Sequence, residues 1–494
     1  MKYLSTRDAT RSVTAAQAIA QGLAPDGGLY VPETIPLVTK AEIETLCEMN
    51  YRERAVDIMS RYLAGEFSRG EIEGFTARAY GDNFDCEKIA PTRFIDKNTG
   101  FLELWHGPTC AFKDMALQML PYLLTASLKK LGEERNVCIL VATSGDTGKA
   151  ALDGFYDVDG TSIVVFYPRD GVSDIQKLQM TTQAGKNVYV CAVEGNFDDA
   201  QAGVKEIFND ENFSKRLGEK GFFLNSANSI NWGRLLPQMV YYFSAYSDYV
   251  NSGNIKLGEK IDFCVPTGNF GNILAGWYVK KMGLPIRKLI CASNENNILT
   301  DFIKTGVYDR NREFYTTISP SMDILVSSNL ERLLFMLSDD KSVKAWMADL
   351  KTKGRYEVGE KILSGIREDF DCGYSTDEEA KASIKLLFDN ENYLMDPHTA
   401  NAQAVLGGLR KNNGVFPTII VSTASPFKFC DSVLDALGAK KSGGVQLIND
   451  LSGASGFKAP PPLAHLFNQK VRFTKCVARE KMSDVVMDFL KNLA

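Results

Sequence analysis

Apolar and polar residues are distributed along the chain in two patterns that together predict its fold class. Continuous apolar runs of strand length occur at 137–142, 162–167, 187–193, 261–265 and 417–422. Stretches with helical spacing of apolar residues lie between and after these runs. Uninterrupted β-branched runs that alternate with helices are typical of a parallel sheet covered on both faces. The pattern therefore predicts an α/β protein built on parallel sheets.

The length of the chain predicts more than one domain. A chain of 494 residues exceeds what one hydrophobic core usually serves. Residues 1–95 carry helical patterns after a glycine-rich turn, so we expect a mainly helical N-terminal region there. The strands and helices of 130–225 suffice for one compact α/β unit.

One helical pattern places a lysine beside a buried face. An apolar run ends at a Gly-Pro turn at 107–108, and one face of the next helix is formed by Phe112, Met115, Ala116, Met119, Leu120, Leu123 and Leu124. Lys113 lies beside that face in the first turn, where its charge opposes the helix dipole. Taken alone, Lys113 is either a solvent-exposed lysine at the edge of the helix face or a lysine whose amine has a chemical function.

Three segments share the plan of an apolar strand, a turn rich in glycine or hydroxyl residues, and the start of a helix. They are 143–148, 267–272 and 423–426. Free N–H groups and the positive end of a helix dipole make such a turn a site for an anion. Glycine in one turn can serve turn geometry alone. Three such turns together favour a ligand with several anionic groups.

The two standard nucleotide motifs, GxGxxG and GxxxxGK[ST], are absent from these turns. A cofactor that needs one lysine amine, one phosphate site and a partner for a ring nitrogen fits the pattern better. Pyridoxal phosphate has these requirements.

A fourth polar segment, 225–234, contains three asparagines, two serines and Arg234 within ten residues. It is either a polar loop with a helix cap or a clamp for an oxyanion, in which the arginine supplies a planar fork of donors. Composition leaves both readings open.

Charge and composition exclude several classes of function. A net charge of −5 gives no electrostatic reason to expect nucleic acid as a partner. The ten cysteines are scattered without a CxxC pair, so we expect no metal site, no disulfide scaffold and a reducing, cytoplasmic setting. No membrane segment or apolar signal core is expected, and a monomer and a small homo-oligomer both remain open. His106, His398 and His465 show no ligand spacing, and we expect structural roles for them.

A series of motifs resembles the threonine synthase family in its longer branch, within the fold type II, tryptophan synthase β-like enzymes that use pyridoxal phosphate. The motifs occur in family order at 23–30, 106–114, 143–148, 228–234, 268–271, 321–328 and 396–399. The resemblance covers essentially the whole chain. It implies a large cofactor-binding α/β domain from 96–129 and 226–494, and a small mobile α/β domain at 130–225 that closes over the site.

The resemblance also implies roles for individual residues. Lys113 resembles the lysine that carries the cofactor and catalyses, and Thr423 resembles the hydroxyl residue at the pyridine nitrogen. The residues that resemble the loop for the cofactor phosphate are Gly268, Asn269, Phe270 and Gly271.

The remaining site residues resemble those that bind the substrate, O-phospho-L-homoserine. The α-carboxylate would be received by Thr143, Ser144, Asp146 and Thr147, and the phosphate by Asn228, Ser229 and Arg234. Shorter members of the fold carry asparagine at the position of Asp146, near the 3′-oxygen of the cofactor. A carboxylate there would repel that oxygen unless it is protonated or turned away.

The implied reaction converts O-phospho-L-homoserine and water to L-threonine and phosphate by γ-elimination and β-addition of water. Two alternatives have the same fold: a threonine dehydratase and a phospholyase that acts on an amino-alcohol phosphate. A third alternative is a non-catalytic binding protein, against which an intact Lys113 and phosphate loop argue.

Overall fold

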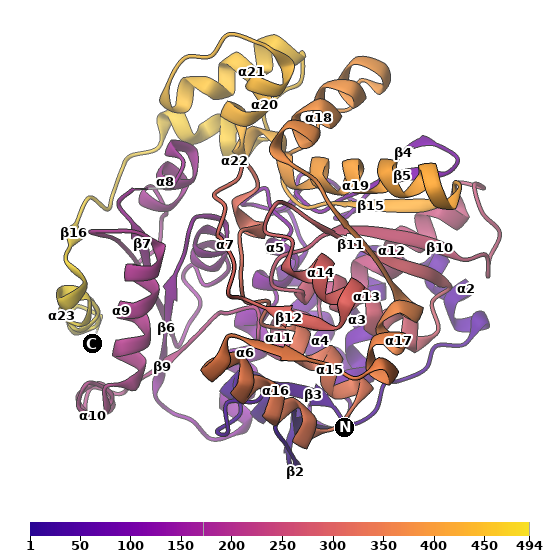
Figure 1. Cartoon of the computed structure of the whole chain (residues 1–494). Helices are drawn as coiled ribbons and strands as arrows, with labels where there is room; N and C mark the ends of the chain where they lie inside the picture. Colours follow the sequence, from indigo (N-terminus) through magenta and orange to yellow (C-terminus); the bar gives the residue numbers. More distant parts are fainter. Residues whose placement is uncertain (171, 494) are drawn as a thin grey trace.

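The computed structural model describes residues 1–170 and 172–493 and is organised around two parallel-stranded sheets (Figure 1). The larger sheet has the strand order β14-β11-β10-β15-β5-β4. Its strands are β4 (Thr92–Asp96), β5 (Thr99–Glu103), β10 (Ile261–Pro266), β11 (Ile286–Ser293), β14 (Phe370–Tyr374) and β15 (Thr418–Ser422). All neighbouring pairs in this sheet are parallel except β4 and β5.

The smaller sheet has the order β16-β8-β7-β6-β9, and its neighbouring strands are all parallel. Its strands are β6 (Asn136–Ala142), β7 (Thr161–Pro168), β8 (Val188–Val193), β9 (Phe222–Asn225) and β16 (Cys476–Val477). Residues on β6 and β7 are almost entirely buried, as strands covered on both faces must be. The prediction of a parallel-sheet α/β fold is confirmed.

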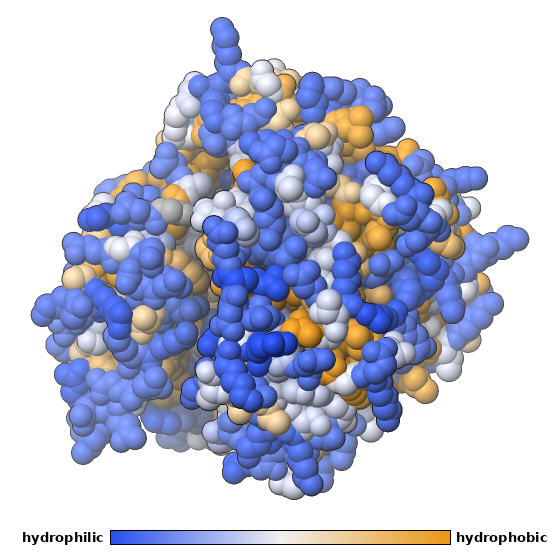
Figure 2. All heavy atoms as spheres, viewed as in Figure 1, coloured by the Kyte–Doolittle hydropathy of each residue, from blue (hydrophilic) through white to orange (hydrophobic). Residues whose placement is uncertain are grey.

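Helices cover both sheets. Around the small sheet lie α7 (Asp146–Gly154), α8 (Asp174–Thr181), α9 (Phe197–Asn209), α10 (Glu211–Gly218) and α23 (Met482–Lys491). The helices associated with the large sheet include α12 (Gln238–Asn251), α13 (Gly271–Met282), α14 (Ile298–Thr305), α17 (Glu360–Asp369), α18 (Asp377–Glu391), α19 (Pro397–Asn413) and α20 (Cys430–Leu437). On the face shown in Figure 2, a furrow separates the lobe with the small sheet from the rest, and both sides are mainly hydrophilic.

The N-terminal region combines helices with a small sheet that the sequence pattern did not predict. Strands β1 (Lys2–Ser5), β2 (Asp8–Thr14) and β3 (Tyr30–Pro32) form an antiparallel sheet in the order β2-β1-β3. The helices α1 (Ala15–Gln21), α2 (Lys40–Glu48), α3 (Tyr51–Leu63) and α4 (Arg69–Ala79) each begin with a capping box, in which the cap and third residues satisfy each other's N–H groups.

The C-terminal segment returns to the small sheet. Strand β16 pairs with β8, and α23 buries Met482, Val485, Val486 and Leu490 in a cluster with residues of β6, β7 and β8. The predicted division of the chain into domains stays a prediction, but it placed this segment with the large domain, and the segment lies with the small sheet instead. A two-residue strand carries too little pattern to be recognised in a sequence.

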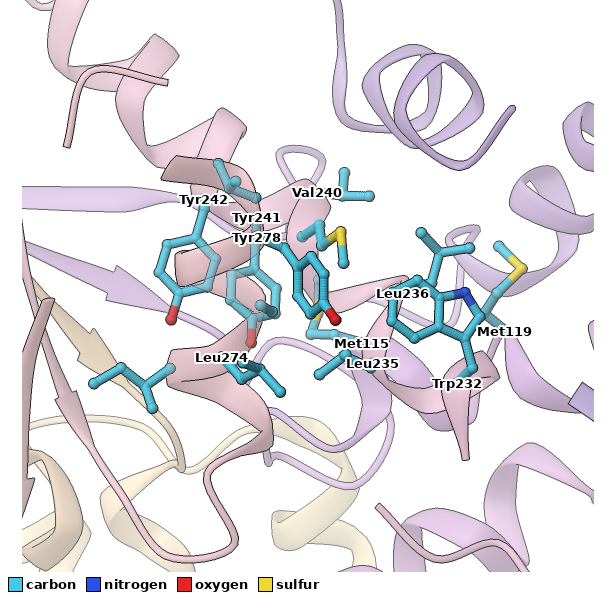
Figure 3. Packing of buried hydrophobic residues seen from close by; sticks show 14 of the residues in the cluster. Met115, Met119, Trp232, Leu235, Leu236, Val240, Tyr241, Tyr242, Leu274 and Tyr278 are labelled. Carbon is cyan, nitrogen blue, oxygen red and sulfur yellow. The ribbon is translucent and has the colours of Figure 1, made fainter. Parts of the chain in front are cut away.

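The apolar face that follows Lys113 lies in the main core. Met115 and Met119 are fully buried beside Trp232, Tyr241 and Tyr278, which come from different helices (Figure 3). The predicted single helix is in fact two, α5 (Asp114–Leu117) and α6 (Leu120–Lys130), because Pro121 starts a new helix in its first turn. The core thereby holds the short helix α5 in place.

Among the described residues, no helix is long and apolar enough to cross a membrane.

Candidate active site

Lys113 lies at the start of α5, in a loop that is held by a buried aspartate. The Asp114 carboxylate accepts hydrogen bonds from the Thr109 N–H at 2.9 Å and the Thr109 hydroxyl at 2.6 Å. A side chain at Gly107 would collide with this carboxylate, because a Cβ there would lie 2.6 Å from its Oδ2. Burial raises the pKa of Asp114 to about 7. The loop therefore fixes the backbone from which Lys113 extends.

The Lys113 amine is buried and has no polar partner closer than 3.5 Å in the part of the chain that the structure describes. Its Nζ lies 3.5 Å from Ser321 Oγ and 3.7 Å from Asp146 Oδ2, and the side chain is 10% exposed. Burial lowers the pKa of Lys113; the Asp146 charge opposes this shift, and the nearby cations Lys428 and Arg234 reinforce it. An amine with a lowered pKa is suited to act as a nucleophile and a base near neutral pH.

Thr423 lies next to this loop, at the end of β15. The Phe112 N–H donates to the Thr423 carbonyl at 2.8 Å, and Ala111 forms an isolated bridge with Ala424. The two segments are separated by about three hundred residues in the sequence but join at the carboxyl end of the large sheet. Ligands in open α/β sheets bind at this edge.

The turn at 267–270 connects β10 to α13 and has the features of an anion site. Phe270, which precedes α13, has a φ of +63° and makes no capping hydrogen bond, so the first N–H groups of the helix are not satisfied by a side chain. Asn272 in the first turn is buried, and its Nδ2 has no partner among the described residues. The turn therefore presents several donors without acceptors.

Residues of a distant segment hold this turn in place. Ser327 Oγ donates to the Gly268 carbonyl at 2.7 Å, and Asn329 Nδ2 donates to the Asn269 carbonyl at 3.0 Å. The same amide lies 3.4 Å from Ser229 Oγ. The structure thereby brings the predicted phosphate loop and the 228–234 segment together. Sequence reasoning did not single out Asn329.

Arg234 lies in the short helix α11 (Trp232–Leu235) and is 3% exposed. Its Nη1 donates to the Ala227 carbonyl at 2.7 Å, whereas its Nε has no partner among the described residues. Burial lowers the pKa of Arg234 to about 10, so the group stays charged at neutral pH. A buried guanidinium without a paired acid is costly unless it binds an anion. Of its predicted companions, Ser229 is half-buried and Asn228 is exposed.

The residues of the loop predicted to bind the substrate carboxylate, at the end of β6, differ in burial and in their contacts. The Thr143 hydroxyl accepts hydrogen bonds from the Gly145 and Gly148 N–H groups at 3.0 and 2.9 Å, so it organises the turn itself. Ser144 is exposed and Thr147 is half-buried. Asp146, at the start of α7, points toward the lysines of the site.

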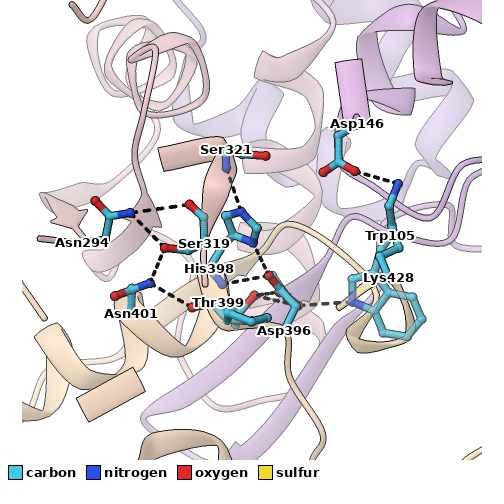
Figure 4. A network of polar contacts seen from close by, with 12 residues as sticks. Trp105, Asp146, Asn294, Ser319, Ser321, Asp396, His398, Thr399, Asn401 and Lys428 are labelled. Carbon is cyan, nitrogen blue, oxygen red and sulfur yellow. Dashed lines mark hydrogen bonds and ion pairs between the residues drawn. The ribbon is translucent and has the colours of Figure 1, made fainter. Parts of the chain in front are cut away.

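Asp146 forms the closest ion pair in the site with Lys428, a residue that sequence reasoning missed. Lys428 Nζ lies 2.9 Å from Asp146 Oδ1 (Figure 4). Burial alone would raise the pKa of Asp146, but the charges of Lys428 and Lys113 outweigh it and the pKa lies well below the ordinary value. Asp146 is therefore ionised and is turned toward cations. Lys428 lies two residues after the third predicted turn, and nothing in the sequence around it indicated that its side chain is buried.

A polar network behind Lys113 includes His398, for which the sequence predicts a structural role. The Ser321 N–H donates to His398 Nε2 at 3.2 Å, so His398 Nδ1 carries the proton and donates to Asp396 Oδ1 at 2.8 Å (Figure 4). The Thr399 hydroxyl donates to the other Asp396 oxygen and accepts from the Ser422 hydroxyl. The network thereby connects Ser321, beside Lys113, with the residue that precedes Thr423.

His106 lies outside this network. It bridges two acids, with Nδ1 2.6 Å from Asp85 Oδ1 and Nε2 3.1 Å from Glu103 Oε2. Burial alone would lower its pKa, but the two carboxylates raise it to about 9.

A surface cavity of about 460 Å³ lies away from these groups. It is lined by residues of α3, α4 and the C-terminal ends of α5 and α7, and none of the predicted site residues lines it. The site is therefore defined by converging chemistry rather than by the size of a cavity.

The residues present fit a small ligand with more than one anionic group. Lys428 and Arg234 supply cations beside the Lys113 amine. Of the two carboxylates that face this amine, Asp146 is paired with Lys428 and Asp114 is bound by Thr109. The start of α13 supplies free N–H groups. The Arg234 Nε, which has no partner among the described residues, is a donor that such a ligand would satisfy. The donor set also suits pyridoxal phosphate, which needs a lysine amine and a phosphate site.

Comparisons with known families match most of the chain. Residues 2–80 match the family described as threonine synthase N terminus, and residues 101–423 match the pyridoxal-phosphate dependent enzymes.

Individual relatives are similar over nearly their whole length or over a large part of it. Threonine synthase from Pseudomonas aeruginosa is 40% identical over 438 residues, which cover 88% of this chain and 90% of that protein. Threonine synthase-like 1 from Homo sapiens is 40% identical over 506 residues; the match covers 96% of this chain but 67% of that longer protein.

A solved structure is also similar. The crystal structure of pyridoxal-phosphate-bound threonine synthase from Brucella melitensis has a TM-score of 0.88 and 38% identity, and it covers 100% of this chain and 99% of that one.

Proposed function

Because this chain belongs to the threonine synthase family of pyridoxal-phosphate-dependent enzymes, we propose that it converts O-phospho-L-homoserine and water to L-threonine and phosphate. The chain is a lyase, and its cofactor is pyridoxal 5′-phosphate. The observation that carries the proposal is the buried Lys113 amine, which lies between the Thr423 turn and two segments that offer donors for phosphate groups.

The residues that would hold the cofactor are Lys113, through its amine, Thr423, at the ring nitrogen, and the turn of Gly268, Asn269, Phe270 and Gly271, at the phosphate. When bound, pyridoxal phosphate supplies an electron sink that stabilises negative charge at the carbons of the substrate. A neutral hydroxyl at position 423 donates or accepts one hydrogen bond and does not force a proton onto the ring nitrogen.

Lys113 would move the protons of the reaction. The net reaction requires loss of a proton and gain of hydroxyl at Cβ, and loss of phosphate and gain of a proton at Cγ, which becomes the methyl group. The Cα proton is removed during the reaction and later returned, because Cα carries one hydrogen in both substrate and product. Lys113 Nζ is the base we assign to the Cα proton and to the later transfers at Cβ, because its lowered pKa leaves the neutral amine accessible.

The substrate would be held at both ends. Arg234, with Ser229 and Asn228, would bind its phosphate, and the unpartnered Arg234 Nε supports this role. The turn of Thr143, Ser144, Asp146 and Thr147 would receive the α-carboxylate through the N–H groups at the start of α7. The Asp146 side chain itself would not contact that carboxylate, since it is paired with lysines.

The α/β unit formed by residues 130–225 would exclude water from the site while the reaction proceeds. Asp146 on α7 and Gln179 on α8 reach across to the large domain, where Gln179 Nε2 lies 3.5 Å from the Thr109 carbonyl. These contacts support our proposal that residues 130–225 close over the site and open to admit substrate.

We also propose a cytoplasmic location, which is supported by ten cysteines that are all free. A monomer and a small homo-oligomer are both compatible with the site, because its residues come from one chain.

The test is a product assay of the purified protein with O-phospho-L-homoserine, with threonine and inorganic phosphate measured separately. We expect equal amounts of both, and no turnover by Lys113→Ala. Phosphate without threonine would favour a phospholyase, and a keto acid formed from threonine would favour a dehydratase. If the purified protein shows no cofactor absorbance in the visible range that Lys113→Ala removes, the alternative of a non-catalytic binding protein is favoured.

A further inference from the structure

Asp146 is shared unequally between two lysines of the large domain. Its Oδ1 lies 2.9 Å from Lys428 Nζ and accepts a hydrogen bond from Gln176 Nε2 at 2.8 Å. Its Oδ2 lies 3.7 Å from Lys113 Nζ, beyond hydrogen-bond distance. The negative charge is therefore committed mainly to Lys428.

Lys428 is built into the site. Its side chain is fully buried, and Nζ also donates to the Thr109 carbonyl at 2.9 Å. A fully buried lysine is rare unless it is paired, and this one has two acceptors in good geometry. Lys113 lies four residues after Thr109, and among the described residues its amine has two long polar contacts, with Ser321 and Asp146, and lies over the Phe112 ring.

We propose that Lys428 is a positioning residue that pairs with Asp146 and so keeps this carboxylate from pairing with Lys113. Without a close counter-ion, the Lys113 amine stays in the neutral form that its reaction with the cofactor requires. The inference rests on the proposed role of Lys113 and deepens it. Lys428 acts through Asp146 and need not touch substrate or cofactor.

The charged groups that face Lys113 support the inference that Lys428 favours the neutral form of its amine. They are Asp146 on α7, Lys428 after β15, Arg234 on α11 and Asp114 on α5. The Asp114 carboxylate is already bound by Thr109. Without Lys428, Asp146 would be the near charge left free to pair with Lys113, and an opposite charge at this distance favours the protonated amine.

The test measures how fast apoprotein recovers its visible absorbance when pyridoxal phosphate is added, as a function of pH and without substrate. The rate follows the fraction of neutral Lys113 amine. In Lys428→Gln we expect the pH midpoint to rise by about one unit, which is about tenfold slower recovery at a fixed pH below the midpoint. Lys428→Arg, which keeps the charge, should stay near the wild-type midpoint.

Two further variants keep the test decisive. In Asp146→Asn combined with Lys428→Gln, both charges are gone and the midpoint should return toward that of the wild type. If Lys428→Gln does not fold, Asp146→Asn alone should lower the midpoint, because Lys428 is then unopposed. Lys149→Gln is the matched control, since Lys149 lies on the same helix as Asp146 but pairs with Asp153 at 3.2 Å; its midpoint should not move.

An unchanged midpoint in Lys428→Gln, or a midpoint in the double variant as high as in Lys428→Gln, would overturn the inference. A failure of the proposed function would give a different result from a failure of this inference. In that case wild-type apoprotein would gain no absorbance that Lys113→Ala lacks, whatever residue stands at position 428.

Discussion

Arg234 and Arg332 are both buried arginines, yet their guanidinium groups are used differently. Arg332 donates to the Tyr30 carbonyl at 2.9 Å, to Asn329 and to the Ile230 carbonyl, so it ties the N-terminal sheet to the phosphate segment. Within residues 1–170 and 172–493, Arg234 has one acceptor, the Ala227 carbonyl, and its Nε has no partner. The contacts of Arg332 are those of a structural residue, whereas the free donor of Arg234 is typical of a ligand-binding residue.

This difference predicts separate effects of truncation. Arg234→Ala should raise the KM for O-phospho-L-homoserine about 10- to 100-fold, because a charge-assisted contact of about 1.5–3 kcal/mol is lost. Arg332→Ala should lower stability by about 3–5 kcal/mol, because buried carbonyls lose their donors. Steady-state kinetics and denaturant unfolding of both variants would distinguish the roles, and an unchanged KM in Arg234→Ala would remove it from the phosphate site.

At the scale of elements, the turn between β10 and α13 is shaped by how closely another segment approaches it. A Cβ at Gly268 would lie 2.5 Å from the Ser321 carbonyl oxygen, which is backbone and cannot rotate away. At Gly271, the first residue of α13, a Cβ would meet its nearest atom at 3.5 Å, an ordinary contact.

We therefore expect Gly268→Ala and Gly271→Ala to differ although they are three residues apart. Gly268→Ala should displace the turn, weaken pyridoxal-phosphate binding at least tenfold and cost about 1–3 kcal/mol of stability. Gly271→Ala should fold normally, and alanine suits a helix better than glycine. Fluorescence titration of the apoproteins with the cofactor measures the affinity. Equal affinities would show that the approach of Ser321 does not shape the turn.

Strand β5 contributes a titratable link at its end, where His106 joins Glu103 to Asp85 of the N-terminal region. The folded pKa of His106, about 9, exceeds its ordinary value of 6.5. The folded protein therefore binds this proton more tightly than the unfolded chain. The stabilisation is complete below pH 6.5 and disappears as pH rises through 9.

We expect His106→Gln to lower the free energy of unfolding by on the order of 2 kcal/mol at about pH 6, with the difference shrinking toward zero above about pH 9. Denaturant unfolding of both proteins across this range is the measurement. A difference that stays constant with pH would mean that the histidine acts through packing on Trp105 and not through its charge.

What the sequence predicts about these elements depends on whether the signal is local. The turns after β6, β10 and β15 were predictable, because an apolar strand followed by glycine or hydroxyl residues is a pattern within about ten residues. The positions of the Lys428 and His398 side chains were not predictable. Their roles come from contacts with Asp146 and Ser321, and the sequence carries no local sign that their side chains are buried.

For the whole molecule, the small sheet is completed by a segment from the far end of the chain. Leu490 of α23 is fully buried against this sheet, while its neighbour Lys491 is exposed. We expect Leu490→Ala to cost about 2–5 kcal/mol, and Lys491→Ala to cost almost nothing. Hydrogen exchange should speed up in β7 and β8 of Leu490→Ala and stay unchanged in β10. Faster exchange throughout both sheets would mean that the two lobes unfold as one unit.

This arrangement has a consequence for the order in which the protein is made. Cys191 on β8 and Lys475 beside β16 are in contact although they are 284 residues apart in the sequence. At ribosomal rates of about 5–20 residues per second, β8 is an unpaired edge strand for tens of seconds after it emerges. During that interval its free N–H and C=O groups can pair with another nascent chain. We therefore expect the aggregation of newly made protein to depend on chaperones that bind exposed strands, and to be relieved when synthesis passes α23.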